Sequence, residues 1–214
     1  NIRFHPEEYE KDGRRGVYGR YYTAEELTAE LWKDRKFWKY GGGVTFSGGE
    51  PLMHAEELWP VLEKLKSQSV HIAVETALYA ETKQVRRMLP YADLFIVDMK
   101  ILVPSVCREI LGGEMDVYER NLMLLCQSGR EMVFRIPCNW EYTLGHDNVK
   151  RILECLKRYS HVPVEIFAVH SLGKSKYESL GRKCREWEKV SEKALEELAE
   201  QIKQCGNTVT INSL

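Results

Sequence analysis

The sequence has no closely spaced cysteines. Its six cysteines begin at position 107, and no two of them are closer than 12 residues: Cys107, Cys126, Cys138, Cys155, Cys184 and Cys205. Iron–sulfur and zinc sites usually take ligands from cysteines about two to four residues apart. Secreted disulfide frameworks are also dense in cysteine. The spacing therefore excludes both patterns and indicates free thiols in a reducing compartment, which we expect to be the cytoplasm.

An excess of charge and long apolar runs are also absent. Lysine and arginine number 31 against 32 aspartates and glutamates, a formal net charge of −1. This balance gives no electrostatic reason to expect a nucleic acid or an anionic membrane as partner. No apolar run approaches the roughly 20 residues that cross a bilayer, and no signal-peptide pattern is present. The 214 residues, 43% of them hydrophobic, fit one large domain.

Helical and strand patterns alternate along most of the chain. Residues 1–22 are polar with three glycines, so we expect a loop or frayed leader before a domain over residues 23–214. Thr23 and Glu26 form a capping-box pattern that begins a helix, and we expect Asp147 to cap a later one. The expected strands are 44–46, 71–75, 94–98, 132–136, 163–169 and 208–211, and the expected helices include 55–67, 81–89, 104–111, 117–128 and 191–205.

Several of these strands are apolar throughout, which is typical of a parallel sheet covered by helices. The alternation alone fits a partial (β/α) barrel and a doubly wound sheet equally. In both architectures, ligands bind at the carboxyl ends of the strands. Polar residues gather at those ends in this sequence, next to two glycines and a methionine. Together they form our candidate binding set: Ser47, Gly48, Gly49, Glu50, Glu75, Thr76, Asp98, Met99, Lys100, Arg135 and His170. Each one has an ordinary explanation as a cap, a surface ion pair or a solvated strand end.

The most specific part of the sequence is the string from Gly41 to Pro51, GGGVTFSGGEP. Two glycines at a strand end leave backbone groups uncovered, so a ligand can approach the main chain. Glu50 adds a negative charge for an amine. A lone Gly-Gly-Glu is equally typical of a tight turn, but the whole string resembles the GGVTFSGGEP signature of radical S-adenosylmethionine (SAM) enzymes that activate glycyl-radical enzymes, the pyruvate formate-lyase activating enzyme family.

The resemblance implies a partial barrel, SAM and a 4Fe–4S cluster as cofactors, and an anaerobic reaction. In the complete protein, SAM cleavage gives a 5′-deoxyadenosyl radical that abstracts a glycine Cα hydrogen from a glycyl-radical enzyme, with a flavodoxin or ferredoxin type electron donor. It also implies roles at the strand ends. Gly48, Gly49 and Glu50 hold the SAM amine, and Lys100 and Asp98 hold its carboxylate end. The remaining matched positions border SAM or a cation: Glu75, Thr76, Arg135 and His170.

The chain departs from the family pattern in several places. The CxxxCxxC cluster loop has no counterpart here, so we expect a carboxyl-terminal portion whose first strand and cluster loop precede Asn1. We expect this chain alone to be inactive and to bind SAM weakly at most. A missing first strand would leave residues 44–46 as a sheet edge, which predicts self-association or cover by residues 1–22. Glu75 stands where the family often has aspartate.

Two other functions remain open from the residues alone. One is a metal-dependent hydrolase or lyase with Glu75, Asp98 and His170 as ligands, since three such groups on neighbouring strand ends could bind a divalent ion. Lys100 and Arg135 argue against it because they would compete for the carboxylates. The other is a cluster-less barrel that serves as a binding module.

Overall fold

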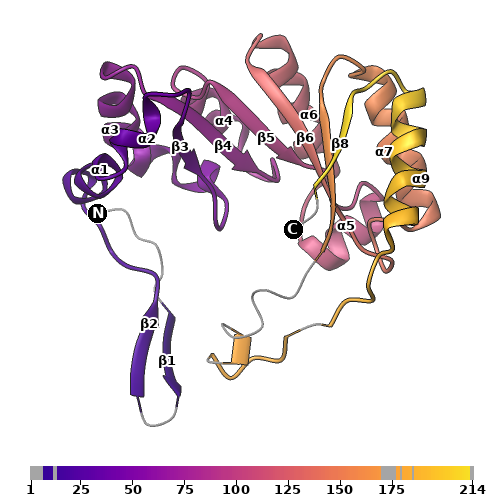
Figure 1. Cartoon of the computed structure of the whole chain (residues 1–214), viewed down its shortest axis with the longest axis horizontal. Coiled ribbons are helices and arrows are strands. Elements are labelled where there is room, and N and C mark those ends of the chain that lie inside the picture. The colour runs from indigo at the N-terminus through magenta and orange to yellow at the C-terminus, as the bar shows by residue number, and fades with distance from the viewer. Residues whose placement is uncertain (1–6, 12–13, 170–176, 179, 185, 213–214) are drawn as a thin grey trace.

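The strands of the main sheet lie side by side in the order in which they occur in the sequence. The structure is a computed structural model, and it describes residues 7–11, 14–169, 177–178, 180–184 and 186–212. In this part of the chain, six parallel strands form the sheet: β3 (Gly43–Phe46), β4 (His71–Thr76), β5 (Leu94–Asp98), β6 (Glu131–Cys138), β7 (Val164–Ala168) and β8 (Val209–Ile211) (Figure 1). A doubly wound sheet reverses its strand order. The unbroken order therefore confirms the partial barrel.

Helices connect successive strands and pack on one face of the sheet (Figure 1). They are α1 (Ala24–Trp32), α2 (Arg35–Trp38), the 3-10 helix η1 (Pro51–His54), α3 (Ala55–Ser67), α4 (Thr82–Met88), α5 (Pro104–Leu111), α6 (Met115–Gln127), α7 (His146–Arg158) and α9 (Glu192–Gln204). The helix predicted over residues 55–67 is confirmed as α3, and its Leu58, Leu62 and Leu65 are buried. This helix runs through Pro60 without ending.

The two faces of the sheet differ in character. Side chains on the helix-covered face are at most 7% exposed and form the core: Val44, Ile72, Val74, Phe95, Val97, Phe134, Ile136, Val164 and Ile166. The opposite face, here the open face, carries half-buried or exposed side chains: Thr45, Glu75, Ile96, Asp98, Val133, Arg135, Glu165 and Phe167. Successive side chains of a strand alternate between faces. The fold therefore brings the polar members of these strands onto one surface.

The helix starts follow the sequence in one case and depart from it in another. Thr23 Oγ1 accepts from the Glu26 backbone N–H at 3.1 Å, and the Glu26 carboxylate accepts from the Thr23 N–H at 2.8 Å. The predicted capping box is thus confirmed. The prediction for Asp147 was wrong, because Gly145 is the N-cap of α7 and Asp147 lies in the first turn. A carboxylate in that turn is favoured by the helix dipole.

The expectation of a loop was wrong for residues 7–11 and 14–18. Strands β1 (Glu7–Lys11) and β2 (Arg14–Tyr18) pair antiparallel and form a separate sheet. Tyr9 pairs with Gly16, and its ring occupies the place where a Cβ of Gly16 would lie, 2.3 Å away. An aromatic side chain that covers a glycine is a known way to hold a strand pair in register. The Asp-Gly pair at 12–13 was the overlooked hairpin signal.

Strand β3 forms one edge of the main sheet. Within the described ranges, the β1–β2 hairpin pairs with itself and not with β3, and Figure 1 shows it standing apart from the sheet. The described residues that were expected to cover this edge therefore do not do so. The helices in the described part of the chain are all too short or too polar to cross a bilayer.

Candidate functional site at the strand ends

The glycine-rich signature forms an exposed turn at the end of β3. Ser47, Gly48 and Gly49 are all exposed, directly after Phe46. Gly48 has φ of +107°, a conformation that side chains with a Cβ rarely adopt. Gly49 has no positive φ, and a Cβ there would meet no atom within 4 Å. The fold therefore needs glycine at position 48, whereas at position 49 glycine leaves the backbone open to a ligand.

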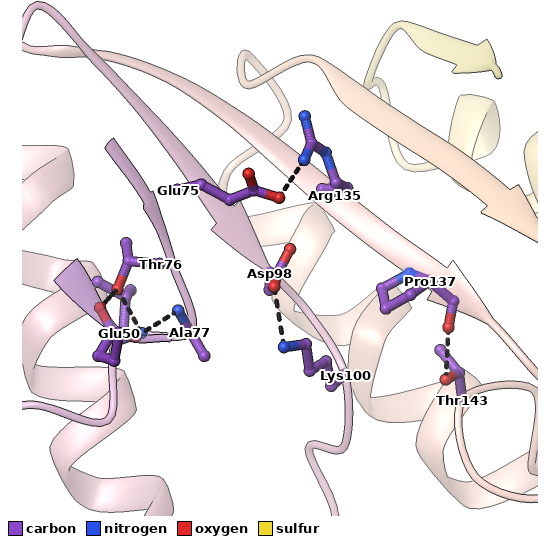
Figure 2. A network of polar contacts seen from close by, with 10 residues as sticks. Glu50, Glu75, Thr76, Ala77, Asp98, Lys100, Arg135, Pro137 and Thr143 are labelled. Atoms are coloured by element: carbon purple, nitrogen blue, oxygen red, sulfur yellow. Dashed lines mark hydrogen bonds and ion pairs between the residues drawn. The ribbon is translucent and has the colours of Figure 1, made fainter. Parts of the chain in front are cut away.

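The Glu50 carboxylate ties this turn to the end of β4 (Figure 2). Its Oε1 accepts from Thr76 Oγ1 at 2.7 Å and from the Leu52 N–H at 3.2 Å, and its Oε2 accepts from the Ala77 N–H at 2.9 Å. A carboxylate has about four acceptor positions. Three are thus used internally, so Glu50 is a fixed negative charge with little capacity left for a ligand amine.

Asp98 and Lys100 form an ion pair at the end of β5. The Lys100 Nζ lies 3.0 Å from Asp98 Oδ2, and the two side chains are 39% and 15% exposed (Figure 2). The lysine is therefore the more accessible partner. A partly exposed pair of this kind has a small net stability, on the order of 1 kcal/mol or less. A ligand carboxylate can therefore compete for Lys100 at little cost.

Arg135 lies between two carboxylates on the open face. It pairs with Glu75 of β4, and its Nε is 3.4 Å from Glu165 Oε2 of β7 (Figure 2 shows the Glu75 contact). In the sheet register Asp98 lies beside Arg135, which in turn lies beside Glu165. The acids Glu75, Asp98 and Glu165 and the bases Arg135 and Lys100 thus form one row of paired charges that extends from β4 to β7.

Two members of the predicted set face away from this row. The Met99 side chain is fully buried in the core, which leaves only its backbone for a ligand. Thr76 is 2% exposed, and its hydroxyl donates to Glu50 while accepting from the Leu78 N–H. It supports the site through Glu50. His170 lies outside the described residues.

The carboxylates of the metal-site alternative already have cationic partners, because Glu75 pairs with Arg135 and Asp98 with Lys100. Among the residues that the structure describes, no three histidine, cysteine, aspartate or glutamate side chains are grouped as metal ligands. The competition expected from the two bases is therefore present, and it favours an ionic ligand with both charges over a divalent ion.

The described thiols do not fit an iron–sulfur cluster. Burial raises the pKa of Cys138 to about 12, and burial is also the main cause that raises the pKa of Cys126 and of Cys155 to about 11. Burial therefore favours the protonated thiol at these three positions. Within the described ranges, no three cysteines lie together as ligands for a metal or a cluster.

Sequence reasoning missed two residues of this site, Glu165 and Asn148. Glu165 is the one acid within the otherwise apolar run of β7, a signal that the alternation of faces could have identified. Asn148 of α7 is 3% exposed and donates to the Lys100 carbonyl at 3.0 Å. No pattern links positions 48 residues apart, so its contact could come only from the fold.

Comparison with known proteins gives activating enzymes among the sequence relatives. The family model for a 4Fe–4S single cluster domain matches residues 4–103, a stretch that contains no cysteine. The chain is 32% identical over 86% of its length to the trans-4-hydroxy-L-proline dehydratase activating enzyme of Clostridioides difficile. It is 33% identical over 75% of its length to the 4-hydroxyphenylacetate decarboxylase activating enzyme of Clostridium scatologenes. It spans 63% and 52% of these two relatives.

A solved structure agrees on the fold. A crystallised domain of the pyruvate-formate lyase-activating enzyme from Bacteroides vulgatus superposes with a TM-score of 0.66 at 24% identity, covering 80% of this chain and 99% of that one. The glycine-rich signature, the sequential parallel sheet and these relatives point the same way. The chain is related to the radical SAM enzymes that activate glycyl-radical enzymes.

Proposed function

We propose that the carboxyl ends of β3, β4 and β5, from here on the rim, bind SAM as part of a protein that activates a glycyl-radical enzyme. The rim comprises Gly48, Gly49, Glu50, Thr76, Asp98 and Lys100. The observation that carries the proposal is the arrangement at neighbouring strand ends. An open glycine backbone and the fixed charge of Glu50 follow β3, and the accessible Lys100 follows β5.

The charges of the rim match those of SAM. The methionine part of SAM is a zwitterion beside a sulfonium, so a site needs acids, a base and space near the main chain. Lys100 would donate to the SAM carboxylate, which would replace part of the contact between Lys100 and Asp98. The backbone at Gly48 and Gly49, with the remaining acceptor position of Glu50, would receive the amine. The acids of the row, Glu75 and Asp98, add negative potential for the cationic centre.

The other parts of the activity require groups beyond this rim. A reduced 4Fe–4S cluster would supply the one electron that cleaves the S–C bond of SAM to methionine and a 5′-deoxyadenosyl radical, which would take the Cα hydrogen of a glycine in the partner enzyme. The described thiols do not fit that cluster, so we expect the chain alone to leave SAM intact. The proposal includes a flavodoxin or ferredoxin type protein as the electron donor and an anaerobic cytoplasm as the location. It also divides the chain into a leader over residues 1–22 and a domain over residues 23–214.

Binding of labelled SAM in equilibrium dialysis tests the proposal. Lys100→Met removes the base, and we expect SAM affinity to fall by about tenfold or more, the effect of losing one charge-assisted contact. Lys66→Met is a matched control, because Lys66 also pairs with an aspartate, Asp93, at 2.7 Å, with similar exposure. Equal affinities for the two variants, or no binding by the unmodified chain, would contradict the proposal.

A further inference from the structure

Asn148 joins the two loops that follow β5 and β6. Its Oδ1 accepts from the Leu102 N–H at 2.6 Å, and its Nδ2 donates to the Lys100 carbonyl at 3.0 Å and to the Thr143 carbonyl at 3.1 Å. The acceptor and both donor hydrogens of the amide are thus used. A buried amide in this state holds its partners strongly, because breaking any contact leaves a polar group without water.

Another buried asparagine, Asn207, serves as a comparison. Asn207 of the α9–β8 connection is also 3% exposed, and its Nδ2 donates to the carbonyls of Tyr159 and Val162 at 2.9 Å each. Those carbonyls precede β7, so they lie at the amino-terminal ends of the strands, opposite the rim. The Oδ1 of Asn207 has no hydrogen-bond partner. Asn148, in contrast, holds the segment that carries Lys100 at two points, the Lys100 carbonyl and the Leu102 N–H.

The backbone at Lys100 determines where its ammonium group can reach. The side chain is 39% exposed and makes one described ion pair, with Asp98. Further anchoring of its position comes from the backbone on either side. The Met99 N–H donates to the Arg135 carbonyl at 2.8 Å, and Asn148 holds the Lys100 carbonyl and the Leu102 N–H. Without Asn148, the loop after position 99 loses these two hydrogen bonds with α7.

We propose that Asn148 is a positioning residue that sets Lys100 for the carboxylate of SAM. The proposal rests on the proposed function, since Lys100 must bind that carboxylate for its position to matter. Asn148 itself touches no ligand. Its contribution passes through the Lys100 backbone, so it is confined to the carboxylate end of the ligand.

Comparison of SAM with decarboxylated SAM isolates this contribution. In equilibrium dialysis with the whole chain, Asn148→Ala should weaken SAM binding by about tenfold and leave the affinity for decarboxylated SAM within about twofold. Asn207→Ala, the matched control, removes a similarly buried amide far from the rim and should change neither affinity. The double variant with Lys100→Met should bind SAM no more weakly than Lys100→Met alone, because both changes remove the same contact.

Other outcomes overturn the inference in distinguishable ways. If Asn148→Ala weakens both ligands equally, or neither, while Lys100→Met weakens SAM selectively, the proposed function stands and the role of Asn148 is wrong. If the unmodified chain binds no SAM, both fail. Should the alanine variant not fold, Asn148→Gln retains the amide and displaces it by one methylene. The same selective loss of SAM affinity is then expected, and affinities equal to those of the unmodified chain would contradict the inference.

Discussion

The two adjacent glycines of the signature occupy their positions for different physical reasons. Gly48 needs its positive φ, whereas Gly49 has neither a special φ nor a neighbour within 4 Å of a Cβ. Alanine at position 48 should therefore lower the free energy of unfolding by about 1–3 kcal/mol, the usual cost of strained backbone. Alanine at position 49 should leave it unchanged or raise it by up to about 1 kcal/mol, since the unfolded chain loses freedom.

The binding consequences of the two changes should also differ. Gly49→Ala places a methyl group where a ligand approaches the main chain, so we expect a loss of SAM affinity without a loss of stability. Urea unfolding and equilibrium dialysis measure the two effects separately. Unaltered SAM binding together with a destabilised Gly49→Ala protein would mean that the second glycine serves only the turn.

The Cys138 thiol makes a pH-dependent contribution to stability. Burial raises its pKa from the ordinary value of 9.0 to about 12, so the folded state retains a proton that the unfolded state loses. This contribution is complete below about pH 9 and is lost as the pH rises toward 12. Between pH 9 and 10, the free energy of unfolding should fall by about 1 kcal/mol from this group. The same measurement on Cys138→Ala should show a smaller decrease, and an equal decrease would contradict this origin.

At the scale of elements, local sequence patterns predicted most helices and strands, but they did not predict which strands lie side by side in the sheet. The predicted strands 94–98 and 132–136 correspond to β5 and β6 because apolar runs of this length are typical of buried strands. The order of the strands was not predictable, since alternation is the same in a barrel and in a doubly wound sheet. The hairpin β1–β2 was missed because its composition is polar and its packing depends on one tyrosine against one glycine.

In the candidate site too, the residues were predictable from the sequence, but the contacts between them were not. The acids and bases at strand ends were predictable, because the carboxyl ends of parallel strands lie at one edge. Their pairing was not, since Glu75 reaches Arg135 across the strand between them. Asn148 was beyond sequence reasoning for the same reason. Its partners lie in two other loops, and only the packed helix brings them within reach.

Strand β3 leads to a prediction about association. It is an edge strand with an exposed Thr45, and unpaired backbone on such an edge pairs readily with another chain. In sedimentation velocity, the chain should therefore associate as its concentration rises. Thr45→Lys should reduce that association because edge lysines oppose strand pairing. Gln127→Lys, at the exposed end of α6 and not on a sheet edge, should not. A monomer at every concentration, or equal effects of both lysines, would contradict the prediction.

For the molecule as a whole, the sheet separates the hydrophobic core from the candidate binding site. One face is covered by helices and carries the core, while the open face and its strand ends carry the row of charges. A hollow of about 770 Å³ lies away from the strand ends, between α1 and α3, and its lining includes Trp32, Pro60 and Lys64. The two places differ in chemistry, because the rim alone combines an open glycine backbone with paired acids and bases.

Amide chemical-shift mapping during a titration with SAM tests the central claim most directly. The account predicts that the largest shifts fall on the backbone amides of Gly48, Gly49 and Lys100, with small changes at Trp32 and Lys64. Shifts confined to the hollow between α1 and α3, or no shifts at millimolar SAM, would contradict the claim that the strand ends form the SAM site.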